Sequence, residues 1–139
     1  MMVVGKTNYY VFTIINYISF FAGILGTLIG GTQTFICTGF VGLLVIIFNH
    51  CGIDTTFLNE VISNNLFLPC IIFNAAGLAT AYAATKHDIR GVETSRSLAF
   101  TNDPYVLLVG ALGGILGYLI FDFENYFGFP VDTGAVSII

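Results

Sequence analysis

A histidine, a cysteine and an aspartate lie close together after a long apolar run, at His50, Cys51 and Asp54. Such side chains bind metals or move protons in many enzymes, but a metal site needs further ligands at a regular spacing. The sequence has no H-x-x-x-H or C-x-x-C motif, and the second histidine, His87, lies in a separate basic segment. We therefore predict no metal, no cofactor, no catalytic residue and no enzymatic activity.

A second feature is the polar interruption Gly-Gly-Thr-Gln-Thr at residues 30–34 of the same apolar run. Interrupted helices free backbone N–H and C=O groups, which membrane transporters use to bind solutes. The five residues Gly30, Gly31, Thr32, Gln33 and Thr34 are therefore our main candidates for a solute site. The alternative is an ordinary tight turn between two helices.

Two more polar side chains, Thr38 and Asn74, lie inside apolar stretches. A polar group left without a partner in hydrocarbon is costly, so these side chains must face other helices, the interruption or water. Asn74 would either hydrogen-bond a partner helix or help to bind a solute or a dehydrated cation. Both residues join the candidate solute site.

Small residues recur at helical spacing in two other segments. They give overlapping small-xxx-small frames, which allow the backbones of membrane helices to approach closely. We predict that they serve helix packing, within the chain or between subunits. The set comprises Gly110, Gly113, Gly114 and Gly117 in one segment and Ala76, Gly77 and Thr80 in another.

The elements that position these residues follow from the distribution of charge. Only 9% of the 139 residues are charged, and three blocks, 7–53, 61–85 and 104–121, carry no charge at all. Crossing the hydrocarbon core takes about 20 apolar residues in a helix. We predict an all-α, polytopic integral membrane protein, in which no charged residue lies within a crossing. A proton- or voltage-driven mechanism then has no visible carrier.

The predicted crossings cover about residues 9–29, 35–50, 66–86 and 105–121 of a single membrane domain, 1–139. The second is short, since its apolar part has only about 14–17 residues and the minimum for a crossing is roughly 17. Residues 52–65 form an interfacial loop or a short surface helix. Pro69 and the pair Asp103-Pro104 mark the starts of the third and fourth helices.

Orientation follows from the basic residues. Three of the four, Lys86, Arg90 and Arg96, lie in the loop 85–104, so we place that loop on the cytoplasmic side of the cell membrane. If the second helix crosses fully, the N-terminus lies outside. If it is re-entrant, the N-terminus lies inside. Both topologies remain open at this point.

The last residues, from 133 on, start like a further helix that the chain does not complete. They predict either the front part of a longer protein, with its C-terminal half or a partner membrane subunit missing, or a short tail lying on the membrane.

The net charge of −4 argues against nucleic acid and leaves the lipid bilayer as the main partner. The first functional hypothesis is a small-solute permease or its N-terminal part. The alternatives are a non-transporting subunit that packs with partner helices and a passive channel formed by a homo-oligomer.

Overall fold

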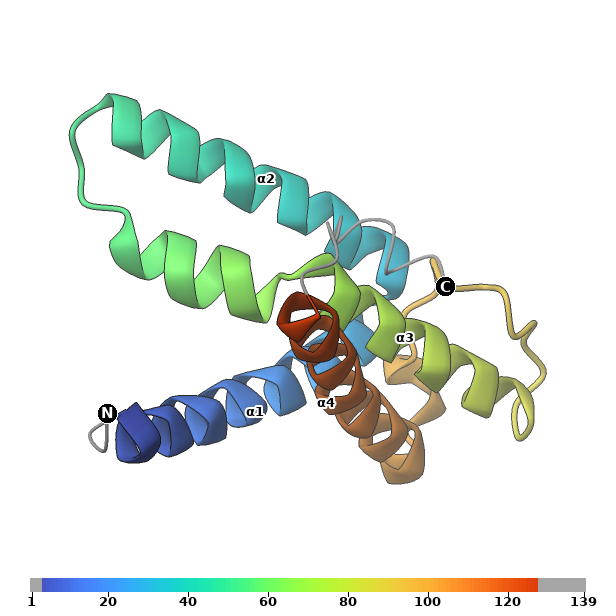
Figure 1. Cartoon of the computed structure of the whole chain (residues 1–139). Coiled ribbons are helices and arrows are strands. Elements are labelled where there is room, and N and C mark those ends of the chain that lie inside the picture. Colours follow the sequence, from blue (N-terminus) through green and yellow to red (C-terminus); the bar gives the residue numbers. More distant parts are fainter. Residues whose placement is uncertain (1–3, 128–139) are drawn as a thin grey trace.

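The structure is a computed structural model that describes residues 4–127. It is all-helical, and no strand occurs among these residues. The element order is α1 Val4–Ile29, α2 Gly31–His50, the π-helix η1 Leu58–Leu66, α3 Pro69–Ala84, the short 3-10 helix η2 Ala99–Thr101 and α4 Pro104–Tyr126 (Figure 1). The predicted all-α class is confirmed. The helix predicted to start at residue 133 lies outside the described residues.

Four segments are long and apolar enough to cross a membrane. They are Tyr9–Ile29, Gly31–His50, Leu58–Ala84 and Pro104–Tyr126. The predicted number of membrane helices therefore agrees with the structure in length and composition, whereas their bounds differ in three places.

The second helix is longer than predicted. The interruption before it is the single residue Gly30, whose φ of 106° turns the chain, and α2 then runs for 20 residues from Gly31. The predicted start at Phe35 is wrong, because Thr32, Gln33 and Thr34 form the first helical turn rather than a loop. A helix of this length is long enough to cross the hydrocarbon core.

The third span contains an interruption that the sequence analysis did not predict. Residues 52–65 were predicted as an interfacial loop or a short surface helix; residues 58–66 form the π-helix η1, and Phe67 and Leu68 separate η1 from α3. Pro69 causes the break, because it has no N–H to continue the ladder and holds Leu68 in an extended conformation, with φ −66° and ψ 123°. The helix predicted over 66–86 is the second half of a broken span.

The fourth helix begins as predicted and ends later. The Asp103 side chain accepts a hydrogen bond from the Tyr105 N–H, and Pro104 occupies the first turn. The helix continues past Phe121 to Tyr126, so Asp122 and Glu124 lie within the candidate span. The predicted end at Phe121 is therefore wrong, because the helix was ended at its first charge.

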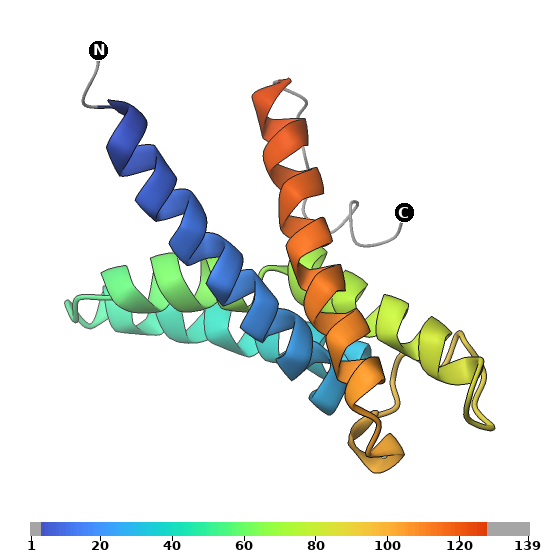
Figure 2. The same ribbon diagram turned by 90° about the horizontal axis from the view of Figure 1, so that it is seen from below.

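Helices α1, α3 and α4 pack most extensively and form the core, while α2 packs mainly on α3 and runs beside η1 (Figure 1). Figure 2 shows that α1 and α4 lie close near the loop 85–103 and diverge away from it. The Gly30 turn lies against this loop, and the turn 51–57 lies at the far end of α2 (Figure 1). Chain direction thus alternates from one span to the next, as four full crossings require.

Candidate functional site

The glycines of α4 hold it against two neighbouring helices at backbone distance. A Cβ added to Gly114 would lie 2.2 Å from the Ser19 carbonyl oxygen of α1, and one added to Gly110 would lie 1.8 Å from Thr27 Oγ1. Gly23 of α1 makes the reciprocal contact, because its Cβ would lie 2.2 Å from the Gly110 oxygen. This frame of α4 therefore faces α1.

The other glycine frame of α4 faces α3. A Cβ on Gly117 would lie 2.4 Å from the Cys70 carbonyl oxygen, and one on Gly113 would lie 3.0 Å from the Ala75 Cα. The predicted packing residues Ala76 and Thr80 are buried on α3, whereas an added Cβ on Gly77 would meet nothing within 4 Å.

A strap formed by residues 94–98 of the long loop covers the Gly30 turn. The Thr94 carbonyl accepts hydrogen bonds from the N–H groups of Gly31 at 2.7 Å and Thr32 at 3.4 Å. Gln33 Nε2 donates to the Ser95 carbonyl, and the Leu98 N–H donates to the Thr27 carbonyl at 3.1 Å. The strap therefore satisfies the backbone groups that the helix start leaves free.

Thr34, the last residue of the predicted interruption, forms its hydrogen bond within the first turn of α2. The Thr34 hydroxyl is buried and donates to the Gly31 carbonyl at 2.7 Å. The Ser97 hydroxyl on the strap donates to the Leu28 carbonyl at the end of α1. The structure thus brings residues 30–34 together with the strap, a contact across more than sixty residues of sequence that local patterns do not reveal.

Thr38 lies at the interruption of the third span. Its hydroxyl donates to the Phe67 carbonyl at 2.9 Å, and its contact with the Thr34 carbonyl measures 3.0 Å. Phe67 O is one of the carbonyls that the break removes from the helical ladder, so α2 supplies the missing donor. The other predicted polar residue of this region, Asn74, is half-buried on α3.

Replacing Thr38 by valine should lower the stability of the folded chain by about 1–3 kcal/mol, because the Phe67 carbonyl loses its donor within a packed interface. Thermal unfolding of the purified chain in detergent would measure the effect. Thr13→Val is the matched control, since Thr13 is exposed and donates only within α1, to the Tyr9 carbonyl. Equal losses in both variants would contradict the role assigned to Thr38.

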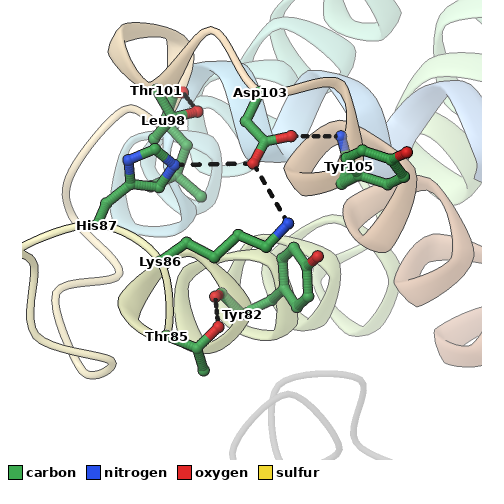
Figure 3. A network of polar contacts seen from close by, with 8 residues as sticks. All are labelled: Tyr82, Thr85, Lys86, His87, Leu98, Thr101, Asp103 and Tyr105. Atoms are coloured by element: carbon green, nitrogen blue, oxygen red, sulfur yellow. Dashed lines mark hydrogen bonds and ion pairs between the residues drawn. The ribbon is translucent and has the colours of Figure 1, made fainter.

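A polar network ties the end of α3 to the start of α4 (Figure 3). Lys86 Nζ lies 3.7 Å and His87 Nε2 lies 3.8 Å from Asp103 Oδ2, while the other oxygen of Asp103 caps α4. The Lys86 ammonium also lies 4.9 Å from the ring centre of Tyr82 and 4.8 Å from that of Tyr105. The network holds the two helix ends beside the loop. The sequence analysis placed Lys86 and His87 in the basic loop and predicted no contact between them and Asp103.

Hydrogen bonding to Tyr82, followed by the nearby charges of Tyr82, Asp103 and Tyr105, raises the pKa of Lys86 above its ordinary value of 10.5. A raised pKa means that the charged form stabilises the fold fully below pH 10.5, and that this stabilisation is lost as the pH rises further. Lys86→Met should therefore lower the unfolding midpoint at neutral pH, and the gap to the native chain should close only above pH 10.5. Arg90→Met controls for removing a cation from the same loop. A gap that stays constant up to pH 11 or so would contradict the assignment.

Two carboxylates at the end of α4 were missed by the sequence analysis. Asp122 is exposed and lines a groove of about 410 Å³ between α1 and α4, together with Tyr9 and Tyr118. Glu124 is half-buried, and its Oε2 atom is buried without a hydrogen-bond partner in the described structure. The apolar run continues up to Phe121, directly before Asp122. This was the signal in the sequence that the helix extends to these carboxylates.

The residues that first suggested metal chemistry lie apart from the core. His50, Cys51 and Asp54 are exposed at the far end of α2. The Asp54 carboxylate accepts from the Thr56 hydroxyl and N–H, and these bonds lower its pKa. Residues 4–127 contain no group of three or more His, Cys, Asp or Glu side chains placed to hold a metal ion.

The fold and the site define an all-helical protein with four spans of membrane-crossing length, packed through glycines and closed at one end by a strap. The chain belongs to a protein family described as a family of unknown function (DUF7973), whose model matches residues 5–139. No curated protein and no solved structure matches the chain.

Proposed function

We propose that the chain is an integral protein of the cell membrane with four crossings and with the loop 85–104 on the cytoplasmic side. The alternating direction of the four spans supports this topology, since the strap places the Gly30 turn and the loop at the same end. The basic residues of the loop then face the cytoplasm. The N-terminus and the turn 51–57 face outward.

We further propose that this protein is a small-solute permease, or the N-terminal part of one. The observation that carries the proposal is the interrupted third span, η1 and α3, with Thr38 bonded to its Phe67 carbonyl. Irregular backbone at membrane depth is tolerated only where protein surrounds it or where it lines a water-filled cavity. Transporters bind their substrates at such breaks, and π-helical turns occur frequently at functional sites.

The solute fits the chemistry of the break. The predicted solute ligands Thr38 and Asn74 are neutral, as are the backbone carbonyls of the break, which favours a small neutral or weakly charged solute. On the cytoplasmic side, the strap occupies the N–H groups of Gly31 and Thr32. In this proposal the described conformation is closed to the cytoplasm, and residues 30–34 become available when the strap moves.

The test is flux through proteoliposomes, measured by light scattering after osmotic shock with small solutes such as glycerol, urea and glycine. We expect solute entry faster than in protein-free liposomes for at least one solute. Pro69→Ala restores an N–H and a continuous helix, so it should abolish that flux while the protein stays folded. Pro104→Ala, which alters the first turn of α4 away from the break, is the matched control.

Two results would contradict the permease. One is flux equal to that of protein-free liposomes for every solute, and the other is full flux in the Pro69→Ala variant.

A second candidate function, a non-transporting subunit that packs with partner helices, is favoured by α2. Added Cβ atoms on Gly39 and Gly42 would meet nothing within 4 Å, unlike those on the glycines at the α1, α3 and α4 contacts. Close approach of another helix would use this face. Gly42→Leu should then reduce the mass of the purified assembly, measured by light scattering in detergent, without changing the unfolding midpoint.

A further inference from the structure

The groove between α1 and α4 combines three aromatic rings with one carboxylate. It has a volume of about 410 Å³ and lies towards the ends at which the two helices diverge (Figure 2). Helix α1 contributes Tyr9 and Phe12, and α4 contributes Tyr118 and Asp122, while aliphatic side chains of α1 complete the lining. The rings of Phe12 and Tyr118 contact each other across the two helices, with 6.2 Å between their centroids. The groove is therefore a concave site built from both helices.

Asp122 gives this groove a negative charge. Its side chain is exposed, and the described ion pairs do not include it. The basic side chains that the structure describes, Lys86, Arg90 and Arg96, all belong to the loop at the other end of α4. Tyr118 lies one helical turn before Asp122, so both side chains lie on the same face of α4. Among the described residues, the groove thus holds a carboxylate that a cation from outside the chain could balance.

Aromatic rings and a carboxylate together select a particular kind of ligand. The faces of Tyr and Phe rings attract cations, and cages of such rings bind alkylated ammonium groups. A metal ion such as calcium instead needs several oxygen ligands, whereas the groove has a single carboxylate. An alkylated ammonium group satisfies both features, because its positive charge balances the carboxylate while its apolar surface packs on the rings. The volume of the groove also fits a small molecule, since ligand pockets occupy about 300–1,000 Å³.

The groove lies near one surface of the membrane in the four-crossing arrangement. Asp122 lies about 27 Å along α4 from Pro104, at about 1.5 Å per residue, which approaches the full thickness of the hydrocarbon core. Tyr9 is the first residue of the first candidate span, and its side chain is exposed. A cation can therefore reach the groove from water without crossing the bilayer.

We propose that the groove between α1 and α4 binds an alkylated ammonium group, through the Asp122 carboxylate and the rings of Tyr9, Phe12 and Tyr118. Asp122 supplies the balancing charge, and the rings contact the alkyl groups of the ligand. Two sources present this chemistry at a membrane surface, a dissolved organic cation and the headgroup of a choline lipid. Binding rests on the groove alone and is independent of the proposed permease function.

The test uses the full chain in dodecyl maltoside, a detergent without an ammonium group, and tetramethylammonium chloride as the probe, which replaces sodium chloride at constant ionic strength. A ligand that binds only the folded state raises the unfolding midpoint with the logarithm of its concentration. We expect this rise in the native chain and an apparent affinity at least tenfold weaker in Asp122→Asn. Glu124→Gln is the matched control, because it removes a carboxylate of the same helix that does not line the groove, and it should keep the native response.

Substitutions of Tyr9 test the contribution of the rings. Tyr9→Leu should weaken the affinity for tetramethylammonium, whereas Tyr9→Phe should retain it, because the ring and not the hydroxyl attracts the cation. Tyr10→Leu is the control, since it removes a neighbouring exposed ring that does not line the groove. An equal response in the native, Asp122→Asn and Tyr9→Leu chains would overturn the proposal, and so would a native midpoint that does not respond to tetramethylammonium.

A comparison of two bilayers identifies the source of the ammonium group. Nanodiscs of digalactosyldiacylglycerol contain no ammonium group, whereas nanodiscs of phosphatidylcholine present one at their surface. If the native chain responds to tetramethylammonium in the first bilayer alone, the lipid headgroup occupies the groove in the second. If it responds in both, the ligand is a dissolved cation. Either result supports the ammonium site, and a response in neither bilayer would overturn it. No readout involves transport, so a failed flux assay leaves this test unaffected.

Discussion

Replacing Gly114 by alanine should destabilise the folded chain by about 2–3 kcal/mol, the upper part of the range for overpacking a tight contact. The added Cβ would lie 2.2 Å from the Ser19 carbonyl oxygen and 3.0 Å from the Gly23 Cα, both of which are backbone atoms. No rotamer change relieves such contacts, so α1 and α4 must move apart. Denaturant titration of the purified chain in mixed micelles would measure the loss.

Gly39→Ala is the control for this substitution, because the same Cβ on α2 would meet nothing within 4 Å. Alanine favours the helix over glycine by up to about 1 kcal/mol, so this variant should be as stable as the native chain or slightly more stable. If Gly114→Ala and Gly39→Ala changed the unfolding free energy equally, the glycine contacts between α1 and α4 would be disproved.

Replacing Gly30 by alanine should cost about 1–3 kcal/mol in backbone strain alone, because its φ of 106° and ψ of 146° lie in a region that is essentially restricted to glycine. The side chain would also lie 3.2 Å from the Arg96 carbonyl group and 2.6 Å from Gln33 Oε1. The strap should therefore detach from the turn. Limited trypsin digestion at Arg90 and Arg96 should become faster, along with a lower unfolding midpoint.

Gly52→Asn provides the comparison for this prediction. Gly52 has a φ of 74°, which asparagine tolerates, and open space around its Cβ position. We expect this variant to keep both the native midpoint and the native rate of digestion. A strap that stays protected in Gly30→Ala would show that the Gly30 turn does not hold it.

Much of the fold was predictable because the long uncharged blocks mark the apolar parts of the helices. The uncharged blocks located α1 and α4, and Asp103 with Pro104 marked the start of α4 correctly. The bounds of α2 were harder to predict, because Gly31–Thr34 has the composition of a turn. The N–H groups of Gly31 and Thr32 are satisfied by Thr94, and no local pattern reveals that contact.

The candidate site was predictable only in part. Polar residues in apolar runs pointed to Thr38, whose hydroxyl does reach the broken span. Two features went unseen, the π-helix before Pro69 and the carboxylate of Glu124. The first depends on packing against both α1 and α2, because five of the nine residues 58–66 are polar. The second was missed because a charge was taken as the end of a membrane helix, whereas α4 continues for four residues beyond Asp122.

The central claim is that the chain crosses the membrane four times, with the Gly30 turn and the loop 85–103 on one side and the turn 51–57 on the other. The most direct test is labelling of single cysteines in intact cells with a membrane-impermeant maleimide. Cys37 and Cys70 are changed to serine throughout, so that Cys51, which is native and exposed in the outward turn, is the single cysteine of the first chain. Thr32→Cys and Arg90→Cys, made with Cys51 also changed to serine, report the other side. We predict that Cys51 labels from outside, and that the other two positions label only after the cells are opened. Labelling of Cys51 and Arg90→Cys from the same side would contradict the four-crossing topology.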